Sequence, residues 1–413
     1  MKIYFVGISG KGMGALAEMI LTAGDRVAGS DLAPDDSIKP LIEAGAEIHI
    51  GPQDGQFLLS SHQKEPIDWL IYTSAVKPNH PELVLAEKLG IKISKRDELI
   101  SYLIEKKDLK MVAIAGTHGK TTTTAMIVWA CLNLGFPISY LVGSTMPFAP
   151  SGKYTIGSEF LVYEADEYDR NFLAFHPWLS VLTAVSYDHP DIYPTHEDYE
   201  AAFRQFESQS LTVISDLDSD PHLNLAGEVR RNDATLAMHA VMKIAESLNR
   251  RLDYKDLREL MNTYPGATRR FEKLADGFYT DYAHHPEEVA ATVEIALEEV
   301  ERERKQGVVA LYEPLTNTRQ AEVFSGYKEA FMGVTKLIWL PTFHAREDTT
   351  KREILPEEFV ASLMNRDVAE TGELTDELFD RLIKYKNSGY LILMMSGGIA
   401  DAWLREKLKS VIK

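Results

Sequence analysis

Residues 111–124 have the sequence MVAIAGTHGKTTTT. An apolar run ends at Ala115 and is followed by a Gly–Thr–His–Gly loop, Lys120, four threonines and an apolar helical pattern. This order predicts a strand, a tight loop and a helix. Glycines let backbone N–H groups approach a phosphate closely, and a helix N-terminus adds partial positive charge. The stretch therefore indicates a phosphate-binding loop in which Lys120 reaches the β- and γ-phosphates of a nucleotide and Thr121 binds Mg²⁺.

The spacing of this loop differs from that of the common phosphate-binding loop. Two residues rather than four separate Gly116 from Gly119. The alternative is a chance glycine-rich turn before a helix. Because GKTT follows a clear apolar strand, the nucleotide site is the better interpretation.

Composition and charge restrict the classes of protein to consider. The chain has 413 residues, of which 45% are hydrophobic and 26% charged, as in globular proteins of two or three domains. Its net charge of -18 argues against general binding to nucleic acid or to an anionic membrane. No apolar run reaches the roughly 18 residues of a membrane helix, and no signal peptide is recognisable at the start. The single cysteine, Cys131, predicts a buried thiol, so the expected setting is the reducing cytoplasm.

The N-terminal segment predicts a second nucleotide site. Residues 2–8 form a short apolar run typical of a buried parallel strand, and SGKGMG, a helical pattern and a strand ending in Asp31 follow. Such a unit binds a diphosphate at the helix N-terminus, and the acid accepts ribose hydroxyls. Ser9 stands where the strict pattern has glycine. The alternative is a similar domain whose glycines only permit close packing.

Strands and helices alternate along the rest of the chain, which predicts parallel sheets flanked by helices. We expect an α/β protein of three domains: a Rossmann-like N-terminal domain, a central domain like a P-loop ATPase and a Rossmann-like C-terminal domain. The polar stretch Lys106–Lys110 and the turn at residues 264–266 suit the boundaries. The predicted domains are residues 1–108, 109–265 and 266–413.

Acidic residues and a histidine follow two predicted strands of the central domain. Residues 160–163 run into EADEYD, which begins at Glu164, and residues 179–184 run into a loop that contains His189. Open parallel sheets bind ligands at the carboxyl ends of their strands. Carboxylate oxygens suit Mg²⁺, and a neutral histidine can join a second ion. The alternative for EADEYD is a solvated acidic turn.

The last third of the chain adds cationic and titratable side chains. ATRRFEKL places Arg269 and Arg270 just after the predicted boundary, and the arginine fork suits phosphate. DYAHHPEEV places Asp281, His284 and His285 between a short strand and a helix that has proline in its first turn. Paired histidines at a strand end exceed what a packed core requires.

The motifs GTHGKTTTT, EADEYD, DHPD, PGATRRFE and DYAHHPEE, in this order and spacing, resemble those of the Mur ligase family. The family consists of ATP-dependent amide-bond ligases of peptidoglycan precursor synthesis, and the resemblance covers nearly the whole chain. It implies that L-alanine is joined to the carboxylate of UDP-N-acetylmuramate through an acyl phosphate. ATP and Mg²⁺ are the implied cofactors, the two small molecules the partners, and we expect a monomer or a homodimer.

The resemblance also implies roles for individual residues. The implied catalytic residues are Lys120, Glu164, His189, Arg270, Asp281, His284, His285 and Arg319. Those implied for ATP are Gly116, Thr117, His118, Gly119, Lys120, Thr121, Thr122, Asn232, Asp233, Arg270 and Asp281. Those implied for the UDP-sugar are Ser9, Gly10, Lys11, Gly12, Met13, Gly14, Ser30, Asp31, Ser74 and His118. Those implied for metal are Thr121, Glu164 and His189. Either histidine of the third domain can accept the amine proton, because the reference pKa of histidine lies near neutrality.

The chain departs from the family pattern in places. The region between Phe206 and Asn232 is short, so we expect the central sheet to lack a strand or two. The segment PLTNTR, residues 314–319, lacks a His–Arg pair that the family usually has. EADEYD, EPLTNT and the closing MSGG are closer to a sister ligase that reattaches a recycled tripeptide. A tripeptide ligase and a non-catalytic sensor of the UDP-sugar or a nucleotide therefore remain alternatives.

Overall fold

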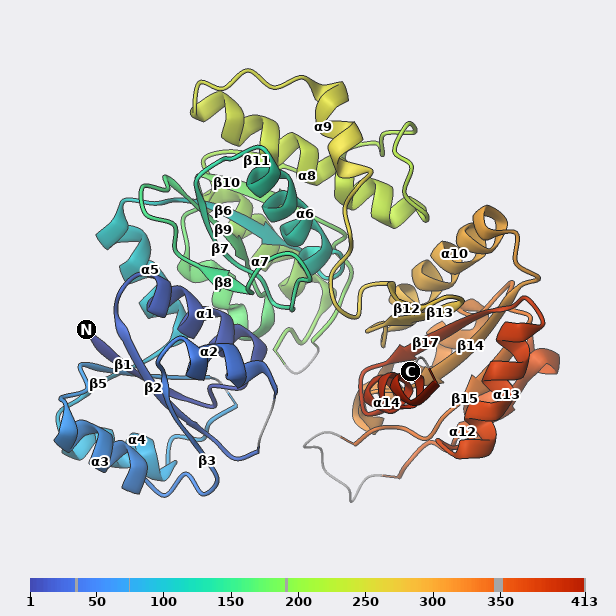
Figure 1. The fold of residues 1–413 in the computed structure, drawn as a ribbon, viewed down its shortest axis with the longest axis horizontal. Helices are drawn as coiled ribbons and strands as arrows, with labels where there is room; N and C mark the ends of the chain where they lie inside the picture. Colours follow the sequence, from blue (N-terminus) through green and yellow to red (C-terminus); the bar gives the residue numbers. More distant parts are fainter. Residues whose placement is uncertain (34–35, 74, 190–191, 345–351, 412–413) are drawn as a thin grey trace. The chain divides into compact units, whose positions relative to one another are not determined.

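The computed structural model describes residues 1–33, 36–73, 75–189, 192–344 and 352–411. The chain forms two compact units (Figure 1). Unit 1 contains residues 1–220 and 233–265, and unit 2 contains residues 221–232 and 266–413. Unit 1 holds two sheets and unit 2 holds one. The division into three domains at residues 108 and 265 stays a prediction.

The first sheet is parallel, with the strand order β3-β2-β1-β4-β5. Its strands are β1 (Lys2–Val6), β2 (Arg26–Asp31), β3 (Glu47–Ile50), β4 (Trp69–Tyr72) and β5 (Lys92–Lys95). Its helices are α1 (Lys11–Thr22), α2 (Lys39–Glu43), α3 (Gln56–Lys64), α4 (Pro81–Lys88) and α5 (Arg96–Lys107), with a 3₁₀ turn η1 (Asp36–Ile38). Ile3 and Phe5 pack on the side of α1 and α5, whereas Tyr4 and Val6 pack on the side of α3 and α4. This alternation buries β1 on both faces, as its apolar run predicts.

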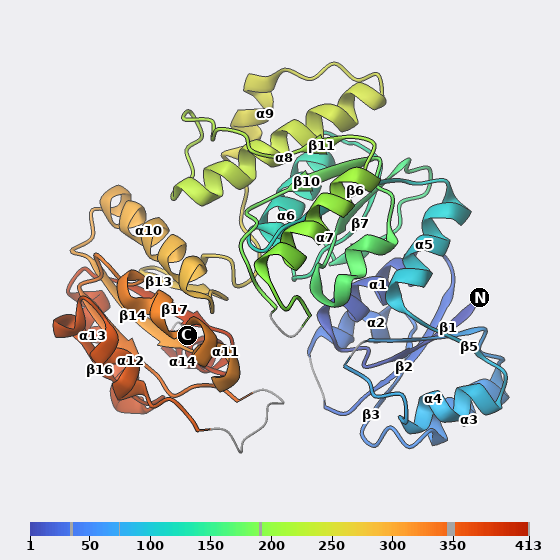
Figure 2. The ribbon, with the colours of Figure 1, turned by 180° about the vertical axis from the view of Figure 1, so that it is seen from behind.

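The second sheet has the order β11-β10-β6-β9-β7-β8 and is parallel except for the β7–β8 pair. Its strands are β6 (Lys110–Ala115), β7 (Ile138–Leu141), β8 (Gly152–Lys153), β9 (Phe160–Glu164), β10 (Leu179–Leu182) and β11 (Val213–Ile214). The helical elements around it are α6 (Lys120–Asn133), η2 (Tyr168–Ala174), α7 (His196–Gln209), α8 (Glu228–Ser247) and α9 (Tyr254–Met261). Figure 2, which views the molecule from the opposite side, shows α6 and α7 beside this sheet. Residues 215–227, all of them described, contain no strand.

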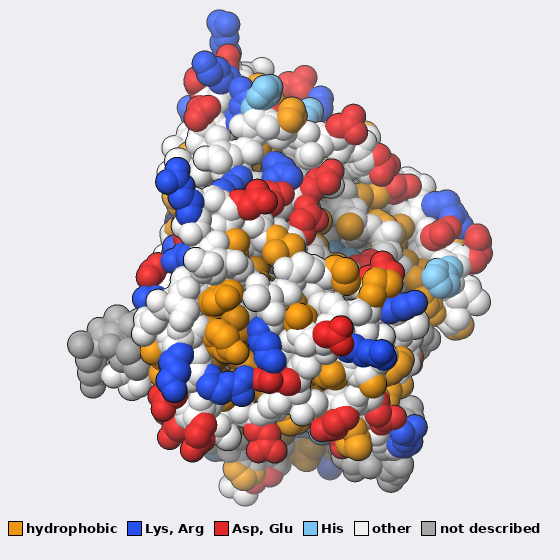
Figure 3. All heavy atoms as spheres, turned by 90° about the vertical axis from the view of Figure 1, so that its right-hand side faces the viewer, with side chains coloured by type: hydrophobic (Ala, Val, Ile, Leu, Met, Phe, Trp, Pro, Cys, Tyr) orange, Lys and Arg blue, Asp and Glu red, His pale blue; other side chains and the backbone are white. Residues whose placement is uncertain are grey.

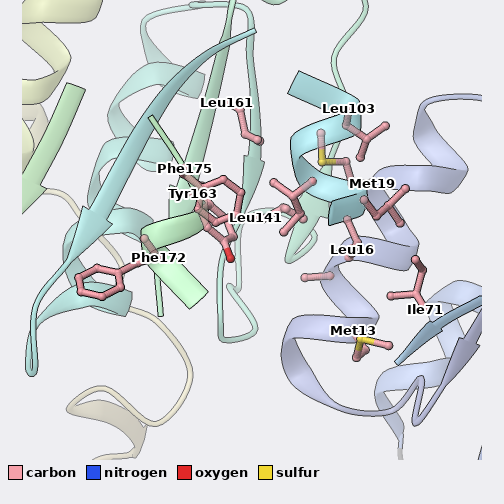
Figure 4. Close-up of a cluster of buried hydrophobic side chains, with 14 of the residues drawn as sticks. Met13, Leu16, Met19, Ile71, Leu103, Leu141, Leu161, Tyr163, Phe172 and Phe175 are labelled. Carbon is pink, nitrogen blue, oxygen red and sulfur yellow. The ribbon is translucent and has the colours of Figure 1, made fainter. Parts of the chain in front are cut away.

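One hydrophobic cluster continues from the first sheet to the second (Figure 4). Met13 and Leu16 come from α1 and Leu103 from α5, whereas Leu161 and Phe172 come from the second sheet and η2. The carboxylate of Glu18 accepts a hydrogen bond from the Gly152 backbone nitrogen at 2.8 Å. A Cβ on Gly152 would lie 1.7 Å from the carbonyl oxygen of Ala15, so only glycine fits where α1 meets β8.

The third sheet has the order β12-β13-β17-β14-β15-β16 and is parallel except for β12–β13. Its strands are β12 (Glu272–Ala275), β13 (Phe278–Asp281), β14 (Val308–Glu313), β15 (Lys336–Trp339), β16 (Ala369–Thr371) and β17 (Leu391–Ser396). Its helical elements are α10 (Pro286–Glu303), α11 (Asn317–Val323), η3 (Phe324–Glu329), α12 (Pro356–Ser362), η4 (Arg366–Val368), α13 (Asp376–Asn387) and α14 (Ala400–Val411). Helices α10 and α12 share one core cluster with the sheet, whereas α13 and α14 share the other. The unit therefore has three layers.

The segment after β14 does not form one continuous α-helix. The short helix α11 ends at Val323 and is followed directly by the 3₁₀ segment η3. Gly326 lies in η3, and glycine weakens an α-helix.

Figure 3 shows a face on which acidic and basic side chains are interspersed. No helix among the described residues combines the length and apolar character that crossing a membrane requires.

Candidate active site

The loop between β6 and α6 is held in its shape by two glycines with positive φ. Gly116 has φ of 144° and Gly119 has φ of 84°. A Cβ on Gly116 would lie 2.1 Å from Oγ1 of Thr183, and one on Gly119 would lie 2.4 Å from Oδ1 of Asp233. The backbone nitrogen of Thr117 donates to the carbonyl oxygen of Ala184 at 2.7 Å. The loop thus takes the predicted strand–loop–helix form, with α6 starting at the predicted lysine.

Lys120 is largely buried, with 15% of its side chain exposed. Its Nζ donates to the carbonyl oxygens of Gly116 at 2.5 Å and Thr117 at 3.1 Å, and lies 2.7 Å from Oε2 of Glu167. Burial alone would lower the pKa of Lys120, but the negative charge of Glu167 raises it above its usual value. Lys120 is therefore a cation held in place at the end of the loop, where α6 begins.

Thr121 and Glu164 place two side-chain oxygen atoms next to each other beside the loop. Oγ1 of Thr121 donates to Oε1 of Glu164 at 2.7 Å, and Oε2 of Glu164 accepts from the Gly143 nitrogen at 2.7 Å. Neighbouring ligands of an octahedral Mg²⁺ at 2.0–2.1 Å lie about 3 Å from each other. The hydroxyl and the carboxylate thus have the chemistry and the separation that Mg²⁺ requires, and both are residues that the sequence predicted for metal.

His189 lies in the loop after β10 and has φ of 58°, a conformation that is uncommon outside glycine. Its Nε2 lies 3.5 Å from Oε1 of Glu167 and 3.6 Å from Oδ2 of Asp188. The structure thus places His189 and Lys120 on the two oxygens of one carboxylate. The sequence predicted the histidine and the lysine but gave Glu167 no role.

A cavity of about 260 Å³ lies between the two glycine-rich loops of unit 1. Lys11 and Gly12 of the first loop line it together with Lys120 and Glu164. Arg96 also lines it, and the sequence analysis overlooked this residue. Its position directly after β5, at the carboxyl edge of the first sheet, was the available clue.

Arg96 spans from the first glycine-rich loop to the acidic stretch after β9. One nitrogen of its guanidinium donates to Oδ2 of Asp166 at 2.8 Å, and the other would lie 2.3 Å from a Cβ on Gly12. The neighbouring Lys95 lies 2.5 Å from Oδ2 of Asp169. EADEYD is therefore tied to the first sheet and is not a solvated acidic turn.

The β1–α1 loop is fixed by the carboxylate of Asp31. Oδ2 of Asp31 accepts from the Ser9 nitrogen at 2.9 Å, and Oδ1 accepts from the Leu32 nitrogen at 2.8 Å. Gly10 is the N-cap of α1, in an extended conformation that leads the chain directly into the helix. Gly14 lies one turn into α1, against the carbonyl oxygen of Ile8. This loop can therefore present backbone N–H groups and the N-terminus of α1 to a diphosphate.

Two side chains predicted to contact the UDP-sugar point inward instead. Met13 is 1% exposed and belongs to the hydrophobic cluster shown in Figure 4. The hydroxyl of Ser30 is fully buried, donates to Glu82 at 2.7 Å and lies 2.8 Å from Nε2 of Gln53. Packing and internal hydrogen bonds thus occupy both side chains, and contact of these two residues with the UDP-sugar stays a prediction. The predicted residue Ser74 lies outside the described residues.

In unit 2, Asp281 fixes the segment that carries the two arginines. Its Oδ2 accepts from the Phe271 nitrogen at 2.6 Å and its Oδ1 from the Ala283 nitrogen at 2.7 Å. Burial raises the pKa of Asp281, and the charge of Arg270 opposes this rise. Arg269 donates to the carbonyl oxygen of Ser396 at the end of β17. Arg269 therefore has a structural partner within the unit.

The paired histidines of unit 2 differ in their surroundings. Nδ1 of His284 lies 3.0 Å from the carbonyl oxygen of Tyr282 and 3.2 Å from Oε2 of Glu288. Burial lowers the pKa of His284 to about 4 despite the charge of Glu288, with a smaller contribution from Arg319. A base of this pKa accepts a proton poorly at neutral pH, which disfavours His284 in that role. His285 caps α10, and its Nδ1 accepts from the Glu287 nitrogen at 3.4 Å.

The remaining predicted residues lie on helices. Thr122 lies in the first turn of α6, and Asp233 of α8 lies against Gly119. Asn232 belongs to the part of α8 that groups with unit 2. Arg319 lies in α11. Of these two neighbours, both implied for ATP, Asp233 is the one that unit 1 holds at the phosphate-binding loop.

Comparisons with known proteins identify the relatives of the chain. The Mur ligase family, catalytic domain, matches residues 2–108, and the Mur ligase middle domain matches residues 114–240. The chain is 30% identical to UDP-N-acetylmuramate–L-alanine ligase of Thermosynechococcus vestitus, over 83% of the chain and 82% of the relative. It is 31% identical to the enzyme of that name from Campylobacter curvus, over 84% and 85%.

Solved structures share the fold. UDP-N-acetylmuramate-alanine ligase from Thermotoga maritima matches with a TM-score of 0.74 at 22% identity, over 100% of both chains. A murein peptide ligase from Psychrobacter arcticus matches with a TM-score of 0.63 at 20% identity, over 99% and 98%. These likenesses confirm the expected α/β class with three mainly parallel sheets. The two family models, which together match more than half of the chain, and the relatives of 30% and 31% identity show that the chain belongs to the Mur ligase family.

Proposed function

We propose that the protein is an ATP-dependent ligase that joins L-alanine to the carboxylate of UDP-N-acetylmuramate and forms ADP and phosphate. The observation that carries the proposal is the cavity of unit 1, where Lys11 and Gly12 face Lys120 and Glu164. A loop suited to a sugar-nucleotide diphosphate thus opens into the same space as a loop suited to ATP. The named relatives, UDP-N-acetylmuramate–L-alanine ligases, support this choice of substrates.

The first half-reaction follows from the charges around the cavity. The muramate carboxylate attacks the γ-phosphate of ATP, so an acyl phosphate forms and ADP leaves. Phosphoryl transfer depends mainly on positioning and charge neutralisation, and Lys120 is a buried cation already fixed beside the loop. When bound by Thr121 and Glu164, Mg²⁺ would supply further neutralisation of the phosphate oxygens. Arg96 also lines the cavity, and we assign it to binding the UDP-sugar.

The second half-reaction requires groups that hold the amino acid. The amine of L-alanine attacks the acyl carbon, and the tetrahedral intermediate releases phosphate and leaves an amide. We assign the carboxylate of L-alanine to Arg319 and the leaving phosphate to Arg270, because a guanidinium suits both anions. His285 is the better candidate of the two histidines for the amine proton, since burial lowers the pKa of His284 to about 4.

Phosphate release from ATP and Mg²⁺ in the presence of UDP-N-acetylmuramate tests the proposal. L-Alanine, glycine, L-serine and the tripeptide L-Ala-γ-D-Glu-diaminopimelate are compared as amines. We expect release to require L-alanine and the product to gain the mass of one alanine residue. Release with the tripeptide alone would identify a tripeptide ligase instead. Tight binding of the UDP-sugar with no release for any amine would identify a sensor.

A further inference from the structure

Glu167 is a buried carboxylate for which the proposed reaction has no role. It is the fourth residue of the acidic stretch after β9, and 2% of its side chain is exposed. Its Oε2 lies 2.7 Å from Nζ of Lys120, and its Oε1 lies 3.5 Å from Nε2 of His189. One carboxylate therefore joins the lysine of the phosphate-binding loop to the histidine predicted for a metal.

Hydrogen bonds to its carbonyl oxygen hold the backbone of Glu167 in place. The carbonyl oxygen of Glu167 accepts from Oη of Tyr193 at 2.6 Å and from the Arg170 nitrogen at 3.0 Å. Tyr193 is itself fully buried. The backbone that carries Glu167 is therefore anchored independently of Lys120.

Glu167 carries its negative charge in this arrangement. Its Oε2 and the Nζ of Lys120 lie at an ion-pair distance of 2.7 Å, and both side chains are largely buried. The two charges compensate each other, and a buried charge that loses its partner is costly.

We propose that Glu167 is the counter-ion of Lys120 in the nucleotide-free protein and makes binding of the nucleoside triphosphate depend on a divalent cation. Triphosphate oxygens that take over Lys120 leave Glu167 uncompensated beside further negative charge. The repulsion between these charges is strong where water is excluded. A divalent cation bound with the nucleotide offsets it. The inference rests on the proposed function, since it takes the nucleotide site as given.

The test compares the dissociation constant of ATP in excess Mg²⁺ with that in excess EDTA. Isothermal titration calorimetry of the full chain, without sugar nucleotide or amine, gives both values for wild type and Glu167→Gln. Glutamine keeps the shape of the side chain and removes its charge. We expect the ratio of the EDTA value to the Mg²⁺ value to fall by about tenfold or more in Glu167→Gln, mainly through tighter binding in EDTA.

Two further variants separate this role from a structural one. Asp169→Asn removes the same charge two residues away, where the partner is Lys95, and should leave the ratio unchanged. Glu167→Asp shortens the side chain by one methylene and moves the charge away from Lys120. Its ratio of the EDTA value to the Mg²⁺ value should lie between those of wild type and Glu167→Gln. It also carries the test if Glu167→Gln does not fold.

The outcomes distinguish the inference from the proposed function beneath it. A wild-type protein that does not bind ATP in Mg²⁺ would remove the nucleotide site and, with it, the proposed ligase. ATP binding with equal ratios in wild type and in the folded Glu167 variants would overturn the counter-ion role alone. A drop of the same size in Asp169→Asn would also overturn it, since any acid of the stretch would then suffice.

Discussion

The two glycine-rich loops of unit 1 share one strand–loop–helix plan and differ in what holds them. The β6–α6 loop has Gly116 and Gly119 at positive φ, and its polar side chains already pair with carboxylates. The β1–α1 loop is held by one carboxylate, Asp31, on the backbone. In the proposed reaction, the first arrangement prepositions charge for phosphoryl transfer, whereas the second offers N–H groups for binding. Substitutions in the β6–α6 loop should therefore change kcat, whereas substitutions that affect the β1–α1 loop should change the affinity for the UDP-sugar.

The largest expected effect in this comparison is that of Lys120→Ala. The variant removes the buried cation from the phosphate-binding loop, and we expect the kcat for ATP-dependent phosphate release to fall about 10³-fold. The measurement is steady-state phosphate release with saturating UDP-N-acetylmuramate and L-alanine. Activity close to wild type would show that the loop is not the ATP site.

A stability control accompanies Lys120→Ala because the variant leaves Glu167 buried without its partner. Breaking such a pair typically costs about 3–5 kcal/mol, so the melting temperature should fall as well. The double variant Lys120→Ala/Glu167→Gln should regain melting temperature but not turnover. If turnover returned with stability, the loss would have come from unfolding rather than from the missing cation.

Thr121→Val should have the next largest effect. Valine keeps the shape of the side chain and removes the hydroxyl that bonds to Glu164, and we expect kcat to fall about 10²-fold with little change in KM for the UDP-sugar. Thr124→Val is the matched control, since its hydroxyl bonds to the carbonyl oxygen of Lys120 within the same helix. Equal losses in the two variants would mean that α6 had been disturbed and that Thr121 has no separate role.

The sequence predicted the parts of the site that depend on local pattern. Glycines, a lysine and threonines after an apolar strand were enough to place the loop and the start of α6 at Lys120. The rule that ligands bind at the carboxyl ends of parallel strands was enough to place Glu164 near the loop, and Thr121 does bond to it. Both inferences need only neighbouring residues and the strand order of a common fold.

Contacts between distant segments could not be predicted in this way. Glu167 pairs with Lys120 because β9 and β6 end at the same edge of the second sheet, whereas Arg96 after β5 of the first sheet pairs with Asp166 after β9 of the second. No spacing in the sequence reveals which acid meets which base. The same limit explains why Ser30 was expected to face a ligand. Its neighbour Asp31 meets the β1–α1 loop, but the hydroxyl of Ser30 bonds to Glu82 on α4.

Gly119→Ala tests the β6–α6 loop by its effect on the free energy of unfolding. An alanine at φ of 84° costs about 1–2 kcal/mol, and its Cβ would lie 2.4 Å from Oδ1 of Asp233. We expect a total loss of roughly 2 kcal/mol or more in urea unfolding. Gly24→Ala is the matched control, because Gly24 has φ of 86° and nothing lies within 4 Å of its added Cβ. Equal losses would show that backbone strain alone, and not the packing of Asp233, keeps position 119 a glycine.

The smallest expected effect belongs to the β1–α1 loop and to Asp31→Asn. Asparagine has one carboxamide oxygen, so it can satisfy the Ser9 or the Leu32 nitrogen but not both as the carboxylate does. Loss of one such hydrogen bond costs about 1 kcal/mol, and KM for the UDP-sugar should rise about fivefold while kcat stays the same. Asp25→Asn, whose carboxylate binds the chain's amino terminus instead, should leave both constants unchanged. A fall in kcat at constant KM would contradict the distinction between the two loops, because the β1–α1 loop would then act on the transition state as the β6–α6 loop does.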